Sequence, residues 1–221
     1  MKFKAAIFDL DGTLVNAYSA WENGYRKMFE SMNHTMTDNE FDRLYRMTSD
    51  ESAQYVRGIY ESQNQGGDGL LPFDTIMGNL AFEMERQYTY EIQAKPYALE
   101  YVQMLHMRRI PICVATLSPM KLAAKVLPRT GFMPYLKFVI TGDDIGLSKK
   151  FPDIYLAAAK MLGSTPLETA VYEDCPTAIK TAHKAGFIVC GVSELHQDHS
   201  TIYPYCHFRI SSYLEACYKA S

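Results

Sequence analysis

Short apolar segments recur along the chain at intervals that a helix can fill, and this alternation limits the possible folds more than any other feature. Each segment is short, rich in Val, Ile, Phe or Ala, and typical of a buried strand. The segments are residues 4–8, 110–116, 138–141, 170–173 and 187–191, with helical patterns at 98–109, 118–127, 153–162 and 176–185. Strands that alternate with helices of about 10–15 residues indicate βαβ units. We therefore predict an α/β fold, a parallel sheet with helices on both faces.

Residues 16–92 interrupt this alternation, because they contain several helical patterns and no convincing strand. The expected helices are 17–32, 38–47, 51–62 and 73–91. Thr37 and Glu40 have the spacing of a capping box for the second helix, and Ser49 is the expected N-cap of the third. We predict an all-helical domain at residues 16–92, inserted into a core made of residues 1–15 and 93–221.

The composition is that of an ordinary soluble globular protein, with 48% hydrophobic and 21% charged residues among 221. A formal net charge of -3 offers no broad basic surface, so no nucleic-acid partner is expected. No segment approaches the roughly 20 apolar residues that span a bilayer, and the N-terminus lacks a secretory pattern. We expect a cytoplasmic protein without a membrane partner. The five cysteines are widely spaced and odd in number, which argues against a disulfide framework.

The residues that follow the first expected strand carry a chemical signal. Asp9, Asp11 and Gly12 come directly after it, and ligands of parallel α/β sheets bind beyond the carboxyl ends of the strands. Gly12 permits a bend that lets both carboxylates face one site. Such a pair can bind a hard cation and divide the work between a nucleophile and a proton donor. An isolated Asp-x-Asp pair would more often be a solvated acidic turn.

Polar residues near the later strand ends favour the catalytic interpretation. Thr116 ends the second strand, and a lysine pair, Lys149 and Lys150, precedes a Phe-Pro-Asp-Ile-Tyr segment. Glu173 and Asp174 stand at the end of the fourth strand. Together these residues supply a hydroxyl, an ammonium group and further carboxylates. A phosphoryl transfer needs this set, namely a nucleophile, a metal site and donors for the phosphate oxygens.

The order and spacing of these residues resemble the four motifs of the haloacid dehalogenase-like superfamily, and the resemblance covers nearly the whole chain. The matching residues, in motif order, are Asp9-x-Asp11-Gly12-Thr13, Thr116, Lys149 and Glu173-Asp174. The helical insertion resembles the cap of the subfamily that includes phosphoglycolate phosphatase and beta-phosphoglucomutase. Family members commonly place the third-motif lysine three residues before a proline, which favours Lys149 over Lys150. The resemblance implies a Rossmann-like core and a mobile helical cap.

The resemblance also implies a role for each residue. Asp9 would attack phosphorus and form an aspartyl phosphate, while Asp11 would protonate the leaving alcohol and then activate water. Magnesium would be held by the Asp9 carboxylate, the Asp11 carbonyl and Asp174, with Glu173 either a further ligand or a neighbour of the metal site. Lys149 would offset the charge of Asp9 and of the phosphate. The residues implied to bind the substrate are Gly12, Thr13, Thr116, Leu117, Ser118 and Lys149.

Two positions depart from the family pattern. After Thr116, which would donate a hydrogen bond to the phosphoryl oxygens, the chain has Leu117 where the family often has Asn or Ser. That position therefore offers only its backbone N–H. After Asp174 the chain has Cys175 where the family usually has Ser. Cys175 is expected to pack as a small residue and not to act as a nucleophile, because acidic surroundings give no reason for a lowered thiol pKa.

The sequence therefore predicts a magnesium-dependent phosphatase for a small phosphorylated metabolite, acting as a monomer or weak homodimer. Two alternatives stay open. A sugar phosphomutase would return the phosphoryl group to a bound sugar instead of to water. A non-enzymatic module would bind a phosphorylated ligand or a partner protein without turnover. A dehalogenase is disfavoured because in this superfamily that chemistry does without the second aspartate, and Asp11 is present.

Overall fold

The computed structural model describes residues 3–64, 70–193 and 200–220. Within these ranges the core is a six-stranded sheet in the order β3-β2-β1-β4-β5-β6, and every pairing is parallel. The strands are β1 Ala5–Phe8, β2 Ile112–Thr116, β3 Val139–Thr141, β4 Thr169–Glu173, β5 Ile188–Val192 and β6 Phe208–Ile210. The predicted parallel α/β sheet is confirmed. β6 was not predicted, because its three residues, with an arginine at the centre, form no apolar run.

Helices cover both faces of the sheet because successive residues of each strand point to opposite sides. In β1, Ile7 packs into one apolar cluster with α8 and α9, whereas Ala6 and Phe8 pack into another with α5, α6 and α10. The core helices are α5 Ala98–Met107, α6 Met120–Arg129, α7 Gly142–Ile145, α8 Asp153–Met161, α9 Pro176–Lys184 and α10 Tyr213–Ala220. Short 3-10 turns lie at η1 Met133–Tyr135, η2 Pro166–Glu168 and η3 Ser200–Tyr205.

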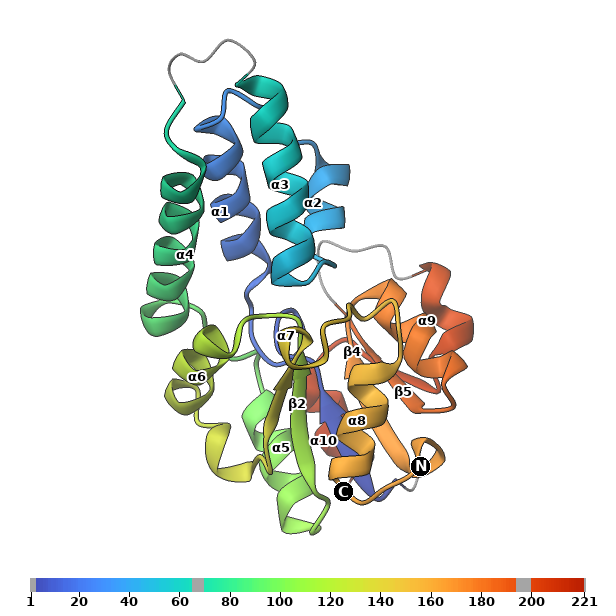
Figure 1. Cartoon of the computed structure of the whole chain (residues 1–221). Helices are drawn as coiled ribbons and strands as arrows, with labels where there is room; N and C mark the ends of the chain where they lie inside the picture. The colour runs from blue at the N-terminus through green and yellow to red at the C-terminus, as the bar shows by residue number, and fades with distance from the viewer. Residues whose placement is uncertain (1–2, 65–69, 194–199, 221) are drawn as a thin grey trace.

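The remaining helices form a group above the sheet (Figure 1). They are α1 Tyr18–Glu30, α2 Asp38–Leu44, α3 Ser49–Gln63 and α4 Phe73–Tyr90. The capping box of Thr37 and Glu40 is present at the start of α2. The expected N-cap of α3 is wrong by one residue, because Thr48 accepts the Glu51 N–H at 3.2 Å and Glu51 reaches back to the Thr48 N–H. Ser49 is the first helical residue instead.

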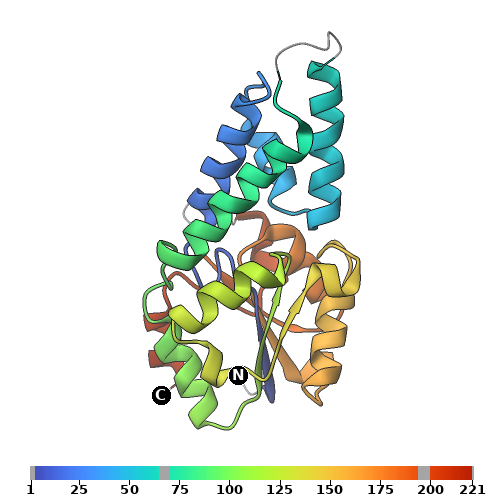
Figure 2. The ribbon, with the colours of Figure 1, turned by 60° about the vertical axis from the view of Figure 1, so that its left-hand side comes forward.

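The helical group joins the core through two segments that run side by side. The Asn16 N–H donates to the Gln93 carbonyl at 2.9 Å, and the Lys95 N–H donates to the Leu14 carbonyl at 2.8 Å. The expected domain boundaries fall at these paired segments. The turned view shows the lower end of α4 resting beside α6 (Figure 2). Among the residues in the described ranges, no helix is long and apolar enough to cross a membrane.

Candidate active site

Three acidic residues meet where β1 and β4 end. These strands are neighbours, with Phe8 opposite Tyr172, and the Asp9 N–H donates to the Tyr172 carbonyl at 3.0 Å. Asp9, Glu173 and Asp174 each offer a carboxylate oxygen, and the three oxygens lie within 4.8 Å of one another. All three side chains are buried. Because hard divalent cations prefer oxygen ligands, this cluster suits magnesium.

The turn after β1 is shaped to fit Asp174. Gly12 has a φ of +82°, and a Cβ atom at this position would lie 2.4 Å from Asp174 Oδ2. Only glycine permits both the backbone conformation and the close approach. Thr13 Oγ1 donates to Asp174 Oδ1 at 2.9 Å. Gly12 and Thr13, expected to bind substrate, thus hold a carboxylate of the acidic cluster in place.

Lys149 is the cation of the site. Its buried ammonium group contacts Asp9 Oδ1 and Glu173 Oε1, whereas Lys150 is exposed. Tyr155 Oη also donates to Glu173 Oε1, at 2.6 Å. Burial alone would lower the pKa of Lys149, but the charges of Asp9 and Glu173 outweigh it and raise the pKa above its ordinary value. Lys149 therefore stays charged beside Asp9.

The carboxyl groups of the cluster repel one another in a dry site. Burial raises the pKa of Asp9 well above its usual range, although Lys149 opposes the effect. Burial, and then the charge of Glu173, raise the pKa of Asp174 to about 7, against the hydrogen bond from Thr13. Several carboxylates held together in this way favour added positive charge, which a bound divalent cation would supply.

Asp11 is held by hydrogen bonds to both of its carboxylate oxygens. Tyr88 Oη, at the end of α4, donates to Oδ1 at 2.7 Å, and Ser118 Oγ donates to Oδ2. Trp21 Nε1, in α1, donates to Tyr88 Oη at 2.8 Å. An indole N–H only donates, so this bond leaves the phenol proton for Asp11 Oδ1, its nearer acceptor at 2.7 Å. With the phenol proton on Oδ1, a protonated Asp11 carries its own proton on Oδ2, where the Ser118 hydroxyl can accept as well as donate.

The segment after β2 closes the site. Thr116 is buried, and its Oγ1 accepts the Ser118 N–H at 3.0 Å, so its hydroxyl proton can point to a ligand oxygen. Leu117 lies against Gly142, where a Cβ would come within 2.8 Å of its side chain. Ser118 was expected to bind substrate, and the structure directs its hydroxyl to Asp11. Cys175 sits in the same site, where burial and the neighbouring Glu173 raise the pKa of its thiol to about 12.

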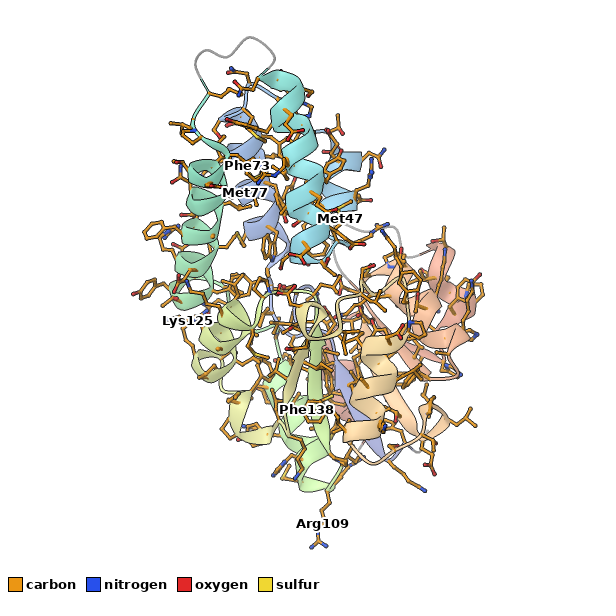
Figure 3. The ribbon with its side chains drawn as sticks, viewed as in Figure 1. Met47, Phe73, Met77, Arg109, Lys125 and Phe138 are labelled. Atoms are coloured by element: carbon orange, nitrogen blue, oxygen red, sulfur yellow. The ribbon has the colours of Figure 1, made fainter. Side chains whose placement is uncertain are left out.

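A cavity of about 280 Å³ lies between the strand ends and the helical group. Its core wall includes Asp9, Asp11, Thr116, Lys149 and Asp174. Its other wall comes from α1, α3, α4 and the segment after α2. Figure 3 places Met47 at the end of the helical group nearest the sheet, and Arg109 at the far end of the core. The cavity thus joins the buried carboxylates to side chains of the inserted helices.

Some residues that shape this site are not evident in the sequence. Tyr88 contacts Asp11, 77 residues away along the chain, and Trp21 contacts Tyr88, 67 residues away. Tyr155 ends the Phe-Pro-Asp-Ile-Tyr segment, whose proline served only to favour Lys149 over Lys150 as the third-motif lysine. No local pattern marks any of these side chains, because their partners come from other elements.

The comparisons with known proteins agree with this geometry. A family model described as haloacid dehalogenase-like hydrolase matches residues 3–186, and the chain belongs to this family. The predicted family membership is therefore confirmed, and with it the prediction that the protein is an enzyme of the hydrolase class.

Relatives are similar over most of their length. The phosphorylated carbohydrates phosphatase of Thermotoga maritima is 25% identical over 183 residues, which is 83% of this chain and 82% of the relative. The validoxylamine A 7'-phosphate phosphatase of Streptomyces hygroscopicus subsp. limoneus is 25% identical over 194 residues, or 88% and 87% of the two chains. The crystal structure of beta-phosphoglucomutase from Clostridium difficile shares the fold, with a TM-score of 0.77, 17% identity, and coverage of 99% of this chain and 96% of that one.

Proposed function

We propose that the protein is a magnesium-dependent phosphatase that hydrolyses a small phosphorylated metabolite through an aspartyl-phosphate intermediate. The observation that carries the proposal is the buried contact of Lys149 with Asp9 at the floor of a cavity. An ammonium group there favours the ionised form of Asp9 and offsets the charge of an arriving phosphate. Family membership and the similarity to the two phosphatases named above support the same reaction class.

The first half-reaction would transfer the phosphoryl group to the protein. A carboxylate oxygen of Asp9 attacks phosphorus, and the bond between phosphorus and the ester oxygen breaks. The leaving oxygen takes the proton from Oδ2 of Asp11 and departs as an alcohol. The Thr116 hydroxyl and the Leu117 N–H are proposed to donate to the phosphoryl oxygens during this step.

The second half-reaction would restore the enzyme. Asp11, now a carboxylate, accepts a proton from water as the water oxygen bonds to phosphorus. The bond between phosphorus and Asp9 breaks, and inorganic phosphate leaves. The side chains of the inserted helices that line the cavity would limit the access of bulk water to the phosphorylated Asp9 until the alcohol has departed.

Asp9 and Asp174 are the side chains proposed to hold magnesium, together with the Asp11 carbonyl. When bound, the ion would reduce the repulsion between the phosphate and the carboxylates. Glu173 is better suited to orient its neighbours, because its Oε1 is already engaged by Lys149 and Tyr155. We therefore propose Glu173 as a neighbour of the metal site that holds Lys149 in place.

A panel of phosphate esters tests the proposal. Phosphate release is measured from sugar phosphates, phosphoglycolate, nucleotides and 4-nitrophenyl phosphate, with magnesium or with a chelator. Asp9→Asn should abolish magnesium-dependent release and keep the fold, as judged by circular dichroism. Asp74→Asn, at an exposed aspartate of α4, is the matched control and should release phosphate normally. Near-normal release by the Asp9 variant would eliminate the mechanism.

The phosphomutase stays the alternative in the same chemistry, since Asp9 and Asp11 could return the phosphoryl group to a sugar. A mutase would release little phosphate and would isomerise a sugar phosphate when a sugar bisphosphate is added. A binding module would do neither. Chromatographic analysis of the sugar products with and without the bisphosphate separates the three cases.

A further inference from the structure

The two walls of the cavity differ in chemistry. The core wall carries the carboxylates, Lys149 and Thr116, which suit a phosphoryl group and a cation. The wall formed by the inserted helices is mostly apolar, and it includes Leu44, Met47, Met77, Leu80, Ala81 and Met84. The phosphate would lie against the core wall, so the alcohol part of a substrate must face the apolar wall.

The polar groups of the apolar wall are largely engaged with other residues. Ser52 Oγ donates to the Ser49 carbonyl at 2.9 Å. The Arg46 guanidinium is paired with Asp42 at 3.2 Å. At the rim, the Lys121 ammonium group is paired with Glu85 at 2.6 Å. Each of these groups is held by a partner of its own, and the Arg46 guanidinium and the Lys121 ammonium group keep further N–H donors at the edge of the wall.

Tyr45 is different, because its hydroxyl is buried and has no hydrogen-bond partner within the described part of the chain. The residue follows α2 and lines the cavity, and its ring packs edge-on against Tyr18 with centroids 5.2 Å apart. Burial, and then the charges of Asp174 and Asp11, raise the pKa of Tyr45 well above its ordinary value. The phenol is therefore neutral and can donate, and a buried donor without a partner in the lining of a cavity is costly.

We infer that the preferred substrate is the phosphate ester of a compact, largely apolar alcohol with one oxygen that accepts a hydrogen bond from Tyr45. This inference rests on the proposed phosphatase function. A polyhydroxylated sugar would lose the water around its hydroxyls and gain few partners on the wall of Met47, Met77 and Leu80. A carbon ring would instead exchange water for apolar contact there. The cavity of about 280 Å³ accommodates a small ring or a short chain beside the phosphate.

Three esters with the same skeleton test the substrate class. Glucose 6-phosphate, tetrahydropyran-2-ylmethyl phosphate and cyclohexylmethyl phosphate are all primary alkyl phosphates on a six-membered ring. The second lacks the ring hydroxyls but keeps the ring oxygen, and the third lacks both. We expect kcat/KM for the two hydroxyl-free esters to exceed that for glucose 6-phosphate by about 10- to 100-fold.

The ring oxygen tests the role of Tyr45. In the wild type, the tetrahydropyran ester should be preferred over the cyclohexyl ester by about three- to tenfold in kcat/KM. Tyr45→Phe should remove this preference and keep the discrimination against glucose 6-phosphate. Tyr101→Phe is the matched control, because Tyr101 is a buried tyrosine whose hydroxyl pairs with Tyr172, away from the cavity.

The apolar wall is tested by adding an amide to it. Met77→Gln should reduce the ratio of kcat/KM for cyclohexylmethyl phosphate to kcat/KM for glucose 6-phosphate by at least about threefold. Met161→Gln, at an exposed methionine of α8, should leave the preference unchanged. The wild-type comparison stands by itself if the Met77 variant folds poorly.

The outcomes distinguish failure of the substrate inference from failure of the proposed phosphatase function. Magnesium-dependent release with glucose 6-phosphate as good as or better than the hydroxyl-free esters would overturn the inference and leave the phosphatase intact. Equal rates for the two hydroxyl-free esters in the wild type would overturn the part assigned to Tyr45. No release from these esters or from 4-nitrophenyl phosphate would overturn the phosphatase itself.

Discussion

Loss of the hydrogen bond from Tyr88 to Asp11 should reduce kcat/KM more for alkyl phosphates than for an aryl phosphate. Tyr88→Phe removes the hydroxyl that donates to Asp11 Oδ1 at 2.7 Å and accepts from Trp21 Nε1 at 2.8 Å. The ring remains, so packing at this fully buried position is conserved. The substitution removes the acceptor of the Trp21 indole N–H and changes how Asp11 is oriented and on which oxygen it carries its proton.

The size of the effect follows from the two hydrogen bonds that hold Asp11. A hydrogen bond to a charged group contributes about 1.5–3 kcal/mol, and each 1.36 kcal/mol corresponds to about a tenfold change in rate. If this orientation matters when the leaving oxygen is protonated, kcat/KM for an alkyl phosphate should fall by about 10- to 100-fold. Ser118 still binds Oδ2, which is why some acid catalysis should remain.

The assay compares two leaving groups. An alkoxide must be protonated as it leaves, whereas 4-nitrophenolate is stable enough to leave without a proton. Tyr88→Phe should therefore reduce kcat/KM strongly for cyclohexylmethyl phosphate and by less than about threefold for 4-nitrophenyl phosphate. Tyr101→Phe, at a buried tyrosine distant from the site, should affect neither substrate.

Equal losses for the two leaving groups would refute this reasoning, since they would indicate a general structural defect. An unchanged rate for the alkyl ester would refute it as well. Trp21→Phe provides a second check, because it leaves the Tyr88 hydroxyl in place but frees it to accept instead of donate. We expect a smaller loss of the same selective kind.

Two further predictions follow from the geometry of single residues. Gly12→Ala should reduce the affinity for magnesium in an activity titration at least about tenfold, because the new Cβ would lie 2.4 Å from Asp174 Oδ2 in a backbone with a φ of +82°. Hydrogen bonds from Arg86 and Gln87 lower the pKa of Glu83 from 4.5 to about 2. A carboxyl group whose pKa is lower in the folded than in the unfolded state stabilises the fold at pH values above its unfolded-state pKa. This stabilisation is lost as the pH falls through the folded-state pKa. Glu83→Gln should therefore lower the melting temperature by roughly 1–2 °C at pH 7. The difference in melting temperature between wild type and variant should vanish as the pH approaches about 2. A constant difference across this pH range would contradict the lowered pKa of Glu83.

The sheet and the acidic cluster could be predicted for the same physical reason. Buried parallel strands require continuous apolar runs, and their carboxyl ends lie on one edge of the sheet. Asp9, Glu173 and Asp174 therefore had to lie together once β1 and β4 were recognised as neighbours. The short β6 and α10 carry weaker patterns and were not predicted. β6 has three residues and α10 has eight, so the position of each depends on the sheet it joins.

The hydrogen bonds of the site could not be predicted in the same way. Ser118 was expected to contact the phosphate, but its backbone turn directs the hydroxyl to Asp11. Tyr45 and Tyr88 lie among many aromatic residues of the inserted helices. Helical periodicity gives the same signal for a tyrosine that packs between helices and for one that faces a cavity. Only the placement of the inserted helices over the sheet separates the two.

The position of Tyr88 suggests that Asp11 stays oriented even if the helical group moves. Arg129 of α6 donates to the Tyr88 carbonyl at 3.3 Å and also to the Ile92 carbonyl, which fixes the end of α4 close to the paired linking segments. A rotation about those segments displaces nearby atoms least and distant atoms most. The far part of α4, where Met77 lies, would swing away from the cavity while Tyr88 kept its contact with Asp11. Substrate entry and the orientation of the acid would then be governed by different parts of one helix.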